Sequence, residues 1–351
     1  ADITITGDAV IKEAIGGKFA AGIGSSLQGK VSVIIEGNST IGKATGGAYA
    51  AGIGGGRQGT GDVTIKDNAQ INESVGGNGG AGIGSGVYGD VTVSIEGNAT
   101  VDKATGGEEG AGIGGGALGT GDVTIEGNVT IENAQGGAGA AGIGGGAETE
   151  PDTEDTRNKV SIKSTEAGSP NITATGGGVL NDENYPLAGA AAIGSGSVAD
   201  GATEVKSAIT IEGKVTIDAT AGGSIAKGDA IAIGDALTGE QKFAGLPVGA
   251  VITRRDSDGV DLTQEGDKPT EPEKPEPEKP NPNPENPNPE QPSEPSGAVS
   301  TSAPAEELTA SDAEYLVTVE GLSVTNALGK QITHSCTQNV QGKVLTIRVN
   351  S

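Results

Sequence analysis

Acidic side chains that could bind a ligand gather in one irregular segment of the chain. The segment spans residues 148–185 and is rich in Asn, Asp and Pro. An acidic run is by default a solvated loop, but loops also carry binding residues, and carboxylate oxygens suit both Ca²⁺ and sugar hydroxyls. The candidate ligand-binding residues of this segment are Glu148, Glu150, Asp152, Asp182, Glu183 and Tyr185.

A second set of carboxylates follows glycine in successive turns. These Gly-Asp pairs contain Asp62, Asp90 and Asp122. They are similar to the turns of calcium-binding β-rolls, in which Asp side chains and backbone carbonyls supply oxygen ligands. The match is incomplete, because Lys30 interrupts the series and because an Asp in a turn commonly bonds to nearby backbone. We expect no cofactor other than this possible calcium.

Catalytic residues for sugar chemistry are sparse. Such chemistry needs two carboxylates in a cleft, usually with aromatic side chains under the sugar rings. The first four repeats described below contain only Phe19, Tyr49 and Tyr88 as aromatic residues, and the one histidine, His334, lies beyond a Pro-rich segment. We therefore expect a protein that is not an enzyme, and a polysaccharide-processing enzyme is the second alternative.

A 30-residue repeat dominates the part of the chain that must position these side chains. The tetrapeptide Ala-Gly-Ile-Gly begins at Ala21, Ala51, Ala81, Ala111 and Ala141. Two degenerate copies follow, with Ile193 and Ile233 at the Ile position. Such a fixed period is typical of stacked repeat architectures, in which each unit covers the apolar face of the next.

Each repeat predicts three short β-strands separated by glycine-rich turns. Apolar and polar residues alternate in the first two segments, which is the period of a strand. Three positions recur as columns of like residues that we expect to point inward: Ile3, Val33, Val63, Val93 and Val123; Ile5, Ile35, Ile65, Ile95 and Ile125; Ile23, Ile53, Ile83, Ile113 and Ile143. The sequence therefore predicts an all-β fold, a right-handed parallel β-helix of about seven 30-residue coils over residues 1–250.

Threonine columns on the outside of such a fold also suit ice binding. One column reads Thr4, Ile34, Thr64, Ser94, Thr124 and the other Val10, Thr40, Gln70, Thr100, Thr130. Bulky or longer residues interrupt both columns, and Thr is common on exposed strands for its β-propensity. Ice binding is therefore a weaker alternative.

Composition and charge exclude several other classes. The formal net charge of −25 argues against nucleic acids and anionic membrane surfaces as partners, since both require basic patches. The chain has no apolar run long enough to insert into a membrane. Its one cysteine, Cys336, cannot form an internal disulfide, which is normal for many exported bacterial proteins.

The C-terminal third has a different composition. Eleven of the 16 prolines lie between Pro269 and Pro295, among Glu, Lys and Asn. This composition favours extended polyproline II, so we expect a Pro- and Glu-rich linker over residues 251–298 that acts as a stalk. Two alternating runs within residues 299–351 predict a small β-module, possibly truncated, near the lower size limit for independent folding.

The repeat Gly-Gly-x-x-x-Ala-Gly-Ile-Gly-Gly-Gly followed by Gly-Asp-Val-Thr-Ile resembles the glycine-rich repeats of β-helix surface proteins of Gram-positive gut bacteria, which are described as adhesin-like or carbohydrate-binding. The resemblance covers residues 1–245. It implies an extracellular location on the bacterial cell surface and an adhesin or binding role toward host or microbial glycans or proteins. The first alternative is a structural surface-layer or filament subunit that self-associates end to end.

Overall fold

The structure is a computed structural model. It describes residues 2–147, 158–181, 186–187, 189–197, 207–223, 231–235, 239–243, 245–268, 335–339 and 344–348. Within these residues the fold is all-β, and the single helical element is the short 3₁₀ helix η1 (Glu265–Asp267). No described helix is long and apolar enough to cross a membrane.

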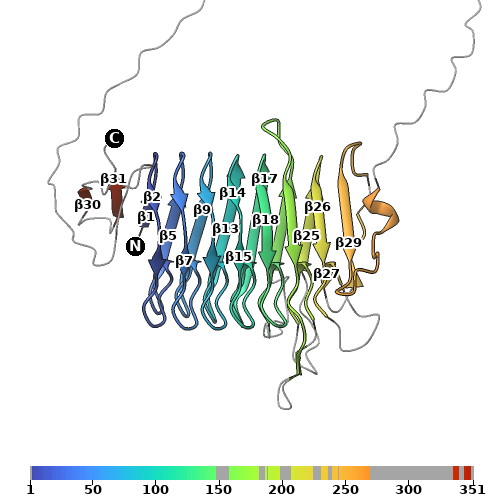
Figure 1. The fold of residues 1–351 in the computed structure, drawn as a ribbon, viewed down its shortest axis with the longest axis horizontal. Coiled ribbons are helices and arrows are strands. Elements are labelled where there is room, and N and C mark those ends of the chain that lie inside the picture. Colours follow the sequence, from blue (N-terminus) through green and yellow to red (C-terminus); the bar gives the residue numbers. More distant parts are fainter. Residues whose placement is uncertain are drawn as a thin grey trace, which may run out of the picture. The chain divides into compact units, whose positions relative to one another are not determined.

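The strands that open successive repeats form one parallel sheet, the first sheet (Figure 1). Its register follows the 30-residue period, because Ile5 pairs with Ile35 and Ile35 pairs with Ile65. The strands are β1 (Asp2–Ile5), β5 (Lys30–Ile35), β9 (Thr60–Ile65), β13 (Asp90–Gly97), β17 (Thr120–Gly127), β20 (Asn158–Lys163) and β25 (Ser207–Glu212).

A second parallel sheet collects the middle strands of the repeats, and a third collects the Ile-Gly strands. The second contains β2 (Val10–Ile11), β6 (Thr40–Ile41), β10 (Gln70–Ile71), β14 (Thr100–Val101), β3 (Ala14–Ile15), β7 (Ala44–Thr45), β11 (Ser74–Val75), β15 (Ala104–Thr105), β18 (Thr130–Gln135), β21 (Asn171–Thr175), β26 (Thr216–Thr220) and β29 (Val251–Arg255). The third contains β4 (Ile23–Gly24), β8 (Ile53–Gly54), β12 (Ile83–Gly84), β16 (Ile113–Gly114), β19 (Ile143–Gly144), β24 (Ile193–Gly194), β27 (Ile233–Asp235) and the antiparallel β28 (Gly239–Glu240). The predicted all-β class with stacked parallel strands is confirmed.

The remaining strands lie outside this regular pattern. β22 (Leu180–Asn181) and β23 (Pro186–Leu187) form a small antiparallel pair. β30 (Ser335–Asn339) and β31 (Val344–Arg348) are antiparallel to each other, and β31 pairs in parallel with β1. In that register Leu345 and Ile347 lie opposite Ile3 and Ile5, so β31 and then β30 extend the first sheet by two strands.

The chain divides into two compact units, residues 1–270 with 315–351, and residues 271–314. β29 and η1 follow residue 250, at the start of the predicted linker, and β29 pairs with β26. The rest of that linker, residues 269–298, lies outside the described residues. Of the predicted module at residues 299–351, only β30 and β31 are described.

The core consists of the inward columns that the repeat predicts. Val33, Ile35 and Ile53 are fully buried, and their equivalents in the following repeats are equally inaccessible. Each β-branched side chain stacks on a like side chain one repeat away, at the spacing of neighbouring strands, about 4.8 Å. The predicted inward columns are therefore confirmed, although Ile3 at the N-terminal edge is only partly buried.

Glycine permits the closest approach between repeats. A Cβ built on Gly47 would overlap the carbonyl oxygen of Gly17, whereas a Cβ on Gly17 meets nothing within 4 Å. The same overlap recurs at Gly77 and Gly107, each against the glycine of the preceding repeat. Stacking therefore requires glycine at this position in the second and later of these repeats. It does not require glycine at Gly17, because no earlier repeat lies against it.

Polar side chains on the outside also stack with the 30-residue period. Asn38 donates a hydrogen bond to Asp8 (3.0 Å), Asn68 donates to Asn38 (3.0 Å) and Asn98 donates to Asn68 (3.1 Å). Such a ladder satisfies each amide with its neighbour and fixes the register between repeats.

A column of alternating charges also fixes the register between repeats. Glu73 lies between Lys43 (2.8 Å) and Lys103 (3.6 Å) of the neighbouring repeats. The hydrogen bond and the charge of Lys43 hold the pKa of the Glu73 carboxyl below its usual 4.5. A register shift by one repeat would place like charges side by side, so the column opposes misalignment.

Candidate functional site

Two turn positions of the repeat require a left-handed backbone. Residues at the first position, which includes Phe19, Tyr49 and Glu109, have φ between 65° and 67°. In the third and fifth repeats the same position holds Gly79 (φ 71°) and Gly139 (φ 68°). The second position holds Gln28, Gln58, Tyr88 and Leu118, with φ between 54° and 57°.

These positions hold three of the six aromatic residues of the chain. Left-handed backbone costs an ordinary L-residue about 1–2 kcal/mol and costs glycine almost nothing. Glycine would therefore serve the turn better than Phe19 or Tyr49, as it does in two neighbouring repeats. Backbone strain that the fold does not require concentrates at functional sites. Glu109 and the residues of the second position bear the same strain, so Phe19 and Tyr49 are distinguished by their aromatic rings and not by strain alone.

The rings of Phe19 and Tyr49 stack on each other. Their centroids lie 5.9 Å apart and their planes differ by 24°. The stack follows from the repeat, because equivalent positions of neighbouring repeats lie one strand spacing apart. Tyr49 is 40% exposed although it is aromatic, so ring surface remains open to solvent.

Arg57 packs against both rings. Its backbone N–H donates to the carbonyl oxygen of Phe19 (3.1 Å), which places it beside the aromatic pair. Its guanidinium carbon lies 5.6 Å from the Phe19 centroid and 5.5 Å from the Tyr49 centroid, within the range of cation–π attraction. The Nε of Arg57 is buried without a hydrogen-bond partner among the described residues.

Lys18 adds a second cation at the ring of Phe19. Its ammonium nitrogen lies 5.0 Å from the Phe19 centroid. Among the residues that the structure describes, neither Lys18 nor Arg57 forms an ion pair, whereas Arg254 and Arg255 are each paired with carboxylates. We call the group formed by Phe19, Tyr49, Arg57 and Lys18 the aromatic platform.

Further exposed apolar surface flanks the aromatic platform. The N–H of Val87 donates to the carbonyl oxygen of Tyr49 (3.0 Å), and the next residue, Tyr88, is 48% exposed. Leu27, one repeat before Arg57, is 45% exposed. Flat aromatic faces with adjacent cations can stack on sugar rings and attract anionic groups, so this surface is suited to binding.

The ligand residues predicted from the sequence fall into two groups, one outside the described residues and one in strands of the first sheet. Glu148, Glu150, Asp152, Asp182, Glu183 and Tyr185 all lie outside the described residues. Of the Gly-Asp set, Asp62 and Asp122 belong to one column with Thr92 between them, while Asp90 lies two residues away along the strand.

The Asp90 carboxylate accepts a hydrogen bond from Thr120 (2.6 Å), in the role of a structural residue. In the described ranges, no three His, Cys, Asp or Glu side chains gather closely enough to hold a metal. The proposed calcium contact at Asp62, Asp90 and Asp122 therefore remains a prediction.

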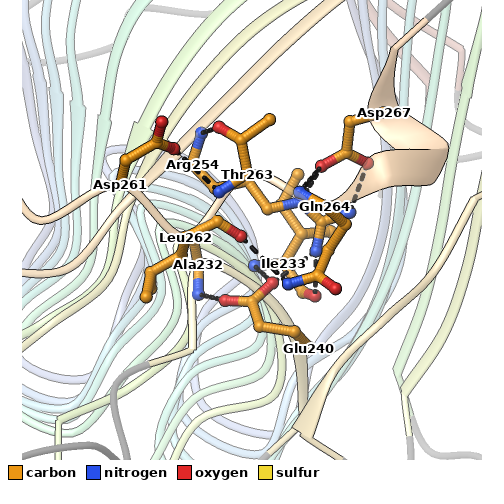
Figure 2. A network of polar contacts seen from close by, with 9 residues as sticks. All are labelled: Ala232, Ile233, Glu240, Arg254, Asp261, Leu262, Thr263, Gln264 and Asp267. Atoms are coloured by element: carbon orange, nitrogen blue, oxygen red, sulfur yellow. Dashed lines mark hydrogen bonds and ion pairs between the residues drawn. The ribbon is translucent and has the colours of Figure 1, made fainter.

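A buried ionic network closes the last described repeat (Figure 2). Arg254 in β29 continues an inward column that is occupied by Ala174 and Ala219 in the two preceding strands. Its side chain is fully buried, with Nε 2.6 Å from Asp267 Oδ2 and a further ion pair to Glu240. The guanidinium also lies 5.3 Å from the Phe243 centroid.

The side chains of this network also form hydrogen bonds with backbone groups at the C-terminal end of the stacked repeats. The N–H of Ile233 donates to Glu240 (3.2 Å), and the N–H of Gln264 donates to Asp267 (2.9 Å). Arg254 in turn donates to the carbonyl oxygen of Ile233 (3.2 Å). Because every ionised group is occupied within the protein, we assign the network to the closure of the fold and not to ligand binding.

The aromatic platform was not predicted from the sequence. In the sequence, Phe19, Tyr49 and Tyr88 stand out only because aromatic residues are scarce. The available signal was positional, because Phe19 and Tyr49 lie 30 residues apart at a repeat position that is glycine in other copies. Of the three residues that depart from glycine at this position, Phe19, Tyr49 and Glu109, the first two are aromatic and lie in neighbouring repeats.

Comparisons of this chain with protein-family models, with curated proteins and with solved structures find no match.

Proposed function

We propose that this chain is a non-catalytic binding module of the bacterial cell surface, which contacts a host or microbial glycan or protein through the aromatic platform. The observation that carries the proposal is the placement of Phe19 and Tyr49, stacked and partly open, at left-handed turn positions where glycine would suffice. Aromatic surface kept at a cost in backbone strain is best accounted for by a ligand.

The proposed architecture is a right-handed parallel β-helix of about seven coils, carried on the Pro-rich segment as a spacer. The fixed 30-residue register in three parallel sheets supports it. In such a scaffold, turn positions of successive coils lie in straight rows, so side chains far apart in sequence become one extended surface. Phe19 and Tyr49 form such a row in the first two repeats, and Arg57 lies beside it.

The alternative of a filament subunit is less well supported. End-to-end growth requires open strand edges at both ends of the stack. Beyond β29, the buried Arg254 network and η1 occupy the position of a further repeat. Burying an ionic group at an edge disfavours the addition of another apolar layer, so this closure favours a discrete binding module.

The test is a glycan and protein array with matched variants of the full chain. The double variant Phe19→Gly/Tyr49→Gly removes both rings and adopts the residue that Gly79 and Gly139 already provide at this position. Glu109→Gly is the control, because it makes the same change at the same turn two repeats away from Tyr49.

We expect specific binding by the wild type, a loss of about tenfold or more in the double variant, and unchanged binding in Glu109→Gly. Equal binding by the double variant, or no binding by the wild type, would overturn the proposal. The acidic segment is a proposed second contact. If it contributes, deletion of residues 148–186 or removal of calcium lowers the affinity, and unchanged affinity in both cases removes it from the site.

A further inference from the structure

Building on the proposed function, we infer that the ligand of the aromatic platform is an acidic glycan, in which Arg57, assisted by Lys18, recognises the carboxylate of a sugar acid. The inference rests on two unpaired cations, which the fold itself does not require.

The repeats show that neither cation is needed for folding. Positions equivalent to Arg57 hold Leu27, Val87, Ala117 and Ala147 in the other regular repeats. Positions equivalent to Lys18 hold Ala48, Asn78, Glu108 and Ala138. The same turn therefore forms with apolar, small, polar or acidic residues, and a cation is found at each position in only one repeat.

The two cations lie at the same aromatic ring. Lys18 and Arg57 both approach the ring of Phe19, at 5.0 and 5.6 Å from its centroid. Two cations at one ring create a local positive potential, which attracts an anion. The chain carries a net charge of −25, yet no described carboxylate pairs with either group. An anion from the ligand would pair with these cations.

Arg57 is oriented for a planar anion. Its guanidinium lies nearly equidistant from two stacked rings, at 5.6 and 5.5 Å, which limits its freedom to move. A guanidinium held in this way offers a fork of N–H donors that matches a carboxylate with two parallel hydrogen bonds. Its Nε is buried, so the two terminal nitrogens are the donors that a ligand can reach.

The aromatic rings identify the rest of the ligand as a sugar. Tyr49 and Tyr88 expose 40% and 48% of their surface, and aromatic faces of this kind stack on the apolar faces of pyranose rings. A sugar acid combines both features in one residue: the ring stacks on the aromatic faces and the carboxylate reaches the cations. A free acidic peptide would satisfy the cations but leave the ring faces without a stacking partner.

The experiment compares matched sugars on the full-length protein. The probes are oligogalacturonides against the same oligomers with their carboxyl groups reduced, and sialyllactose against lactose, measured by titration calorimetry. Sulfated oligosaccharides and poly-glutamate serve as anions of other classes. The variants are Arg57→Gln, Arg57→Lys and Lys18→Gln, with Lys12→Gln as a control lysine elsewhere in the first repeat.

We expect the wild type to bind at least one carboxylated probe about tenfold or more tightly than its neutral counterpart. Arg57→Gln should abolish this preference, Arg57→Lys should retain only part of it, Lys18→Gln should weaken it, and Lys12→Gln should leave it unchanged. Arg57→Lys keeps the charge and loses the fork, so it separates recognition of the carboxylate from general attraction.

Three results would overturn the inference: equal affinity for acidic and neutral sugars, an undiminished preference in Arg57→Gln, or selective binding of sulfated sugars or poly-glutamate. Binding of neutral sugars that is lost in Phe19→Gly/Tyr49→Gly would leave the proposed function standing without the acidic ligand. Absence of binding to every glycan and protein would remove the proposed function as well.

Discussion

The ring of Tyr49 stacks on the ring of Phe19, 30 residues earlier in the chain, with centroids 5.9 Å apart and both residues at φ 65°. The first five repeats have the same left-handed position, and the first two fill it with an aromatic side chain. The repeats are otherwise regular, and we propose that the ligand binds where these side chains differ from those of the other repeats.

The backbone at Tyr49 makes alanine a worse replacement than glycine. Tyr49→Ala loses the ring and keeps the strain, whereas Tyr49→Gly loses the ring and relieves the strain. We expect Tyr49→Gly to be more stable than Tyr49→Ala by about 1 kcal/mol, measured by chemical denaturation. In a right-handed position alanine would be the better residue, so the opposite order would contradict the assigned backbone.

The close stacking of glycines predicts that alanine substitutions at two equivalent positions differ in their effect on stability. Gly47→Ala would place a methyl group against the carbonyl oxygen of Gly17, and relief requires neighbouring repeats to separate. We expect a loss of roughly 3 kcal/mol or more in unfolding free energy. Gly17→Ala has open space and should change stability by about 0.5 kcal/mol or less. Equal effects of the two substitutions would argue against this stacking.

The Lys43–Glu73–Lys103 column predicts a pH-dependent contribution to stability. Because the folded-state pKa of Glu73 lies below its usual 4.5, the contribution is complete above 4.5 and is lost as pH falls through the lower folded-state value. The pKa of Lys43 is raised above 10.5 by its hydrogen bond with Glu73, so its contribution is complete below 10.5 and is lost at higher pH.

We therefore expect Glu73→Gln to be less stable than the wild type near neutral pH and equally stable in strong acid. Thermal unfolding at both pH values measures this difference. High salt should shrink it, because exposed charges are screened. A difference that persists unchanged in acid would show that the carboxylate charge is not its source.

The buried Arg254 network predicts that alanine substitutions at two adjacent arginines differ sharply in their cost to stability. Arg254→Ala leaves Glu240 and Asp267 as uncompensated charges in the interior and should cost about 3–5 kcal/mol. Arg255→Ala removes a pair with Asp218 in which both side chains are well exposed, and should cost about 1 kcal/mol or less.

Hydrogen exchange at Val251–Arg255 reports the change locally. Protection of these amides should fall in Arg254→Ala and remain near the wild-type level in Arg255→Ala. Similar protection in both variants would contradict the assignment of Arg254 to the closure of the stack.

The strand stacking could be predicted from the sequence because it is a repeated, local signal. Val33, Ile35 and Ile53 recur every 30 residues, and a column of like apolar residues has few alternatives to inward stacking. Individual residues that break the period were harder to interpret. Arg254 gives no sign in sequence that it replaces an inward alanine, since its partners Glu240 and Asp267 are brought to it only by folding.

The candidate site was missed for a related reason. Carboxylates form a visible cluster in the sequence around Glu148, whereas Phe19 and Tyr49 lie 30 positions apart and form no cluster there. The strand spacing brings Phe19 and Tyr49 into contact, and the left-handed backbone gives the physical reason why two other repeats hold glycine at this position.

The most direct test of the account is aromatic NMR of the protein labelled at Phe and Tyr, titrated with the ligand that binds best on the array. Two Phe and four Tyr give a sparse spectrum, and variants assign each signal. We predict that the Phe19 and Tyr49 ring resonances shift with ligand while those of the buried Phe243 do not. Saturating ligand that leaves Phe19 and Tyr49 unmoved would contradict it.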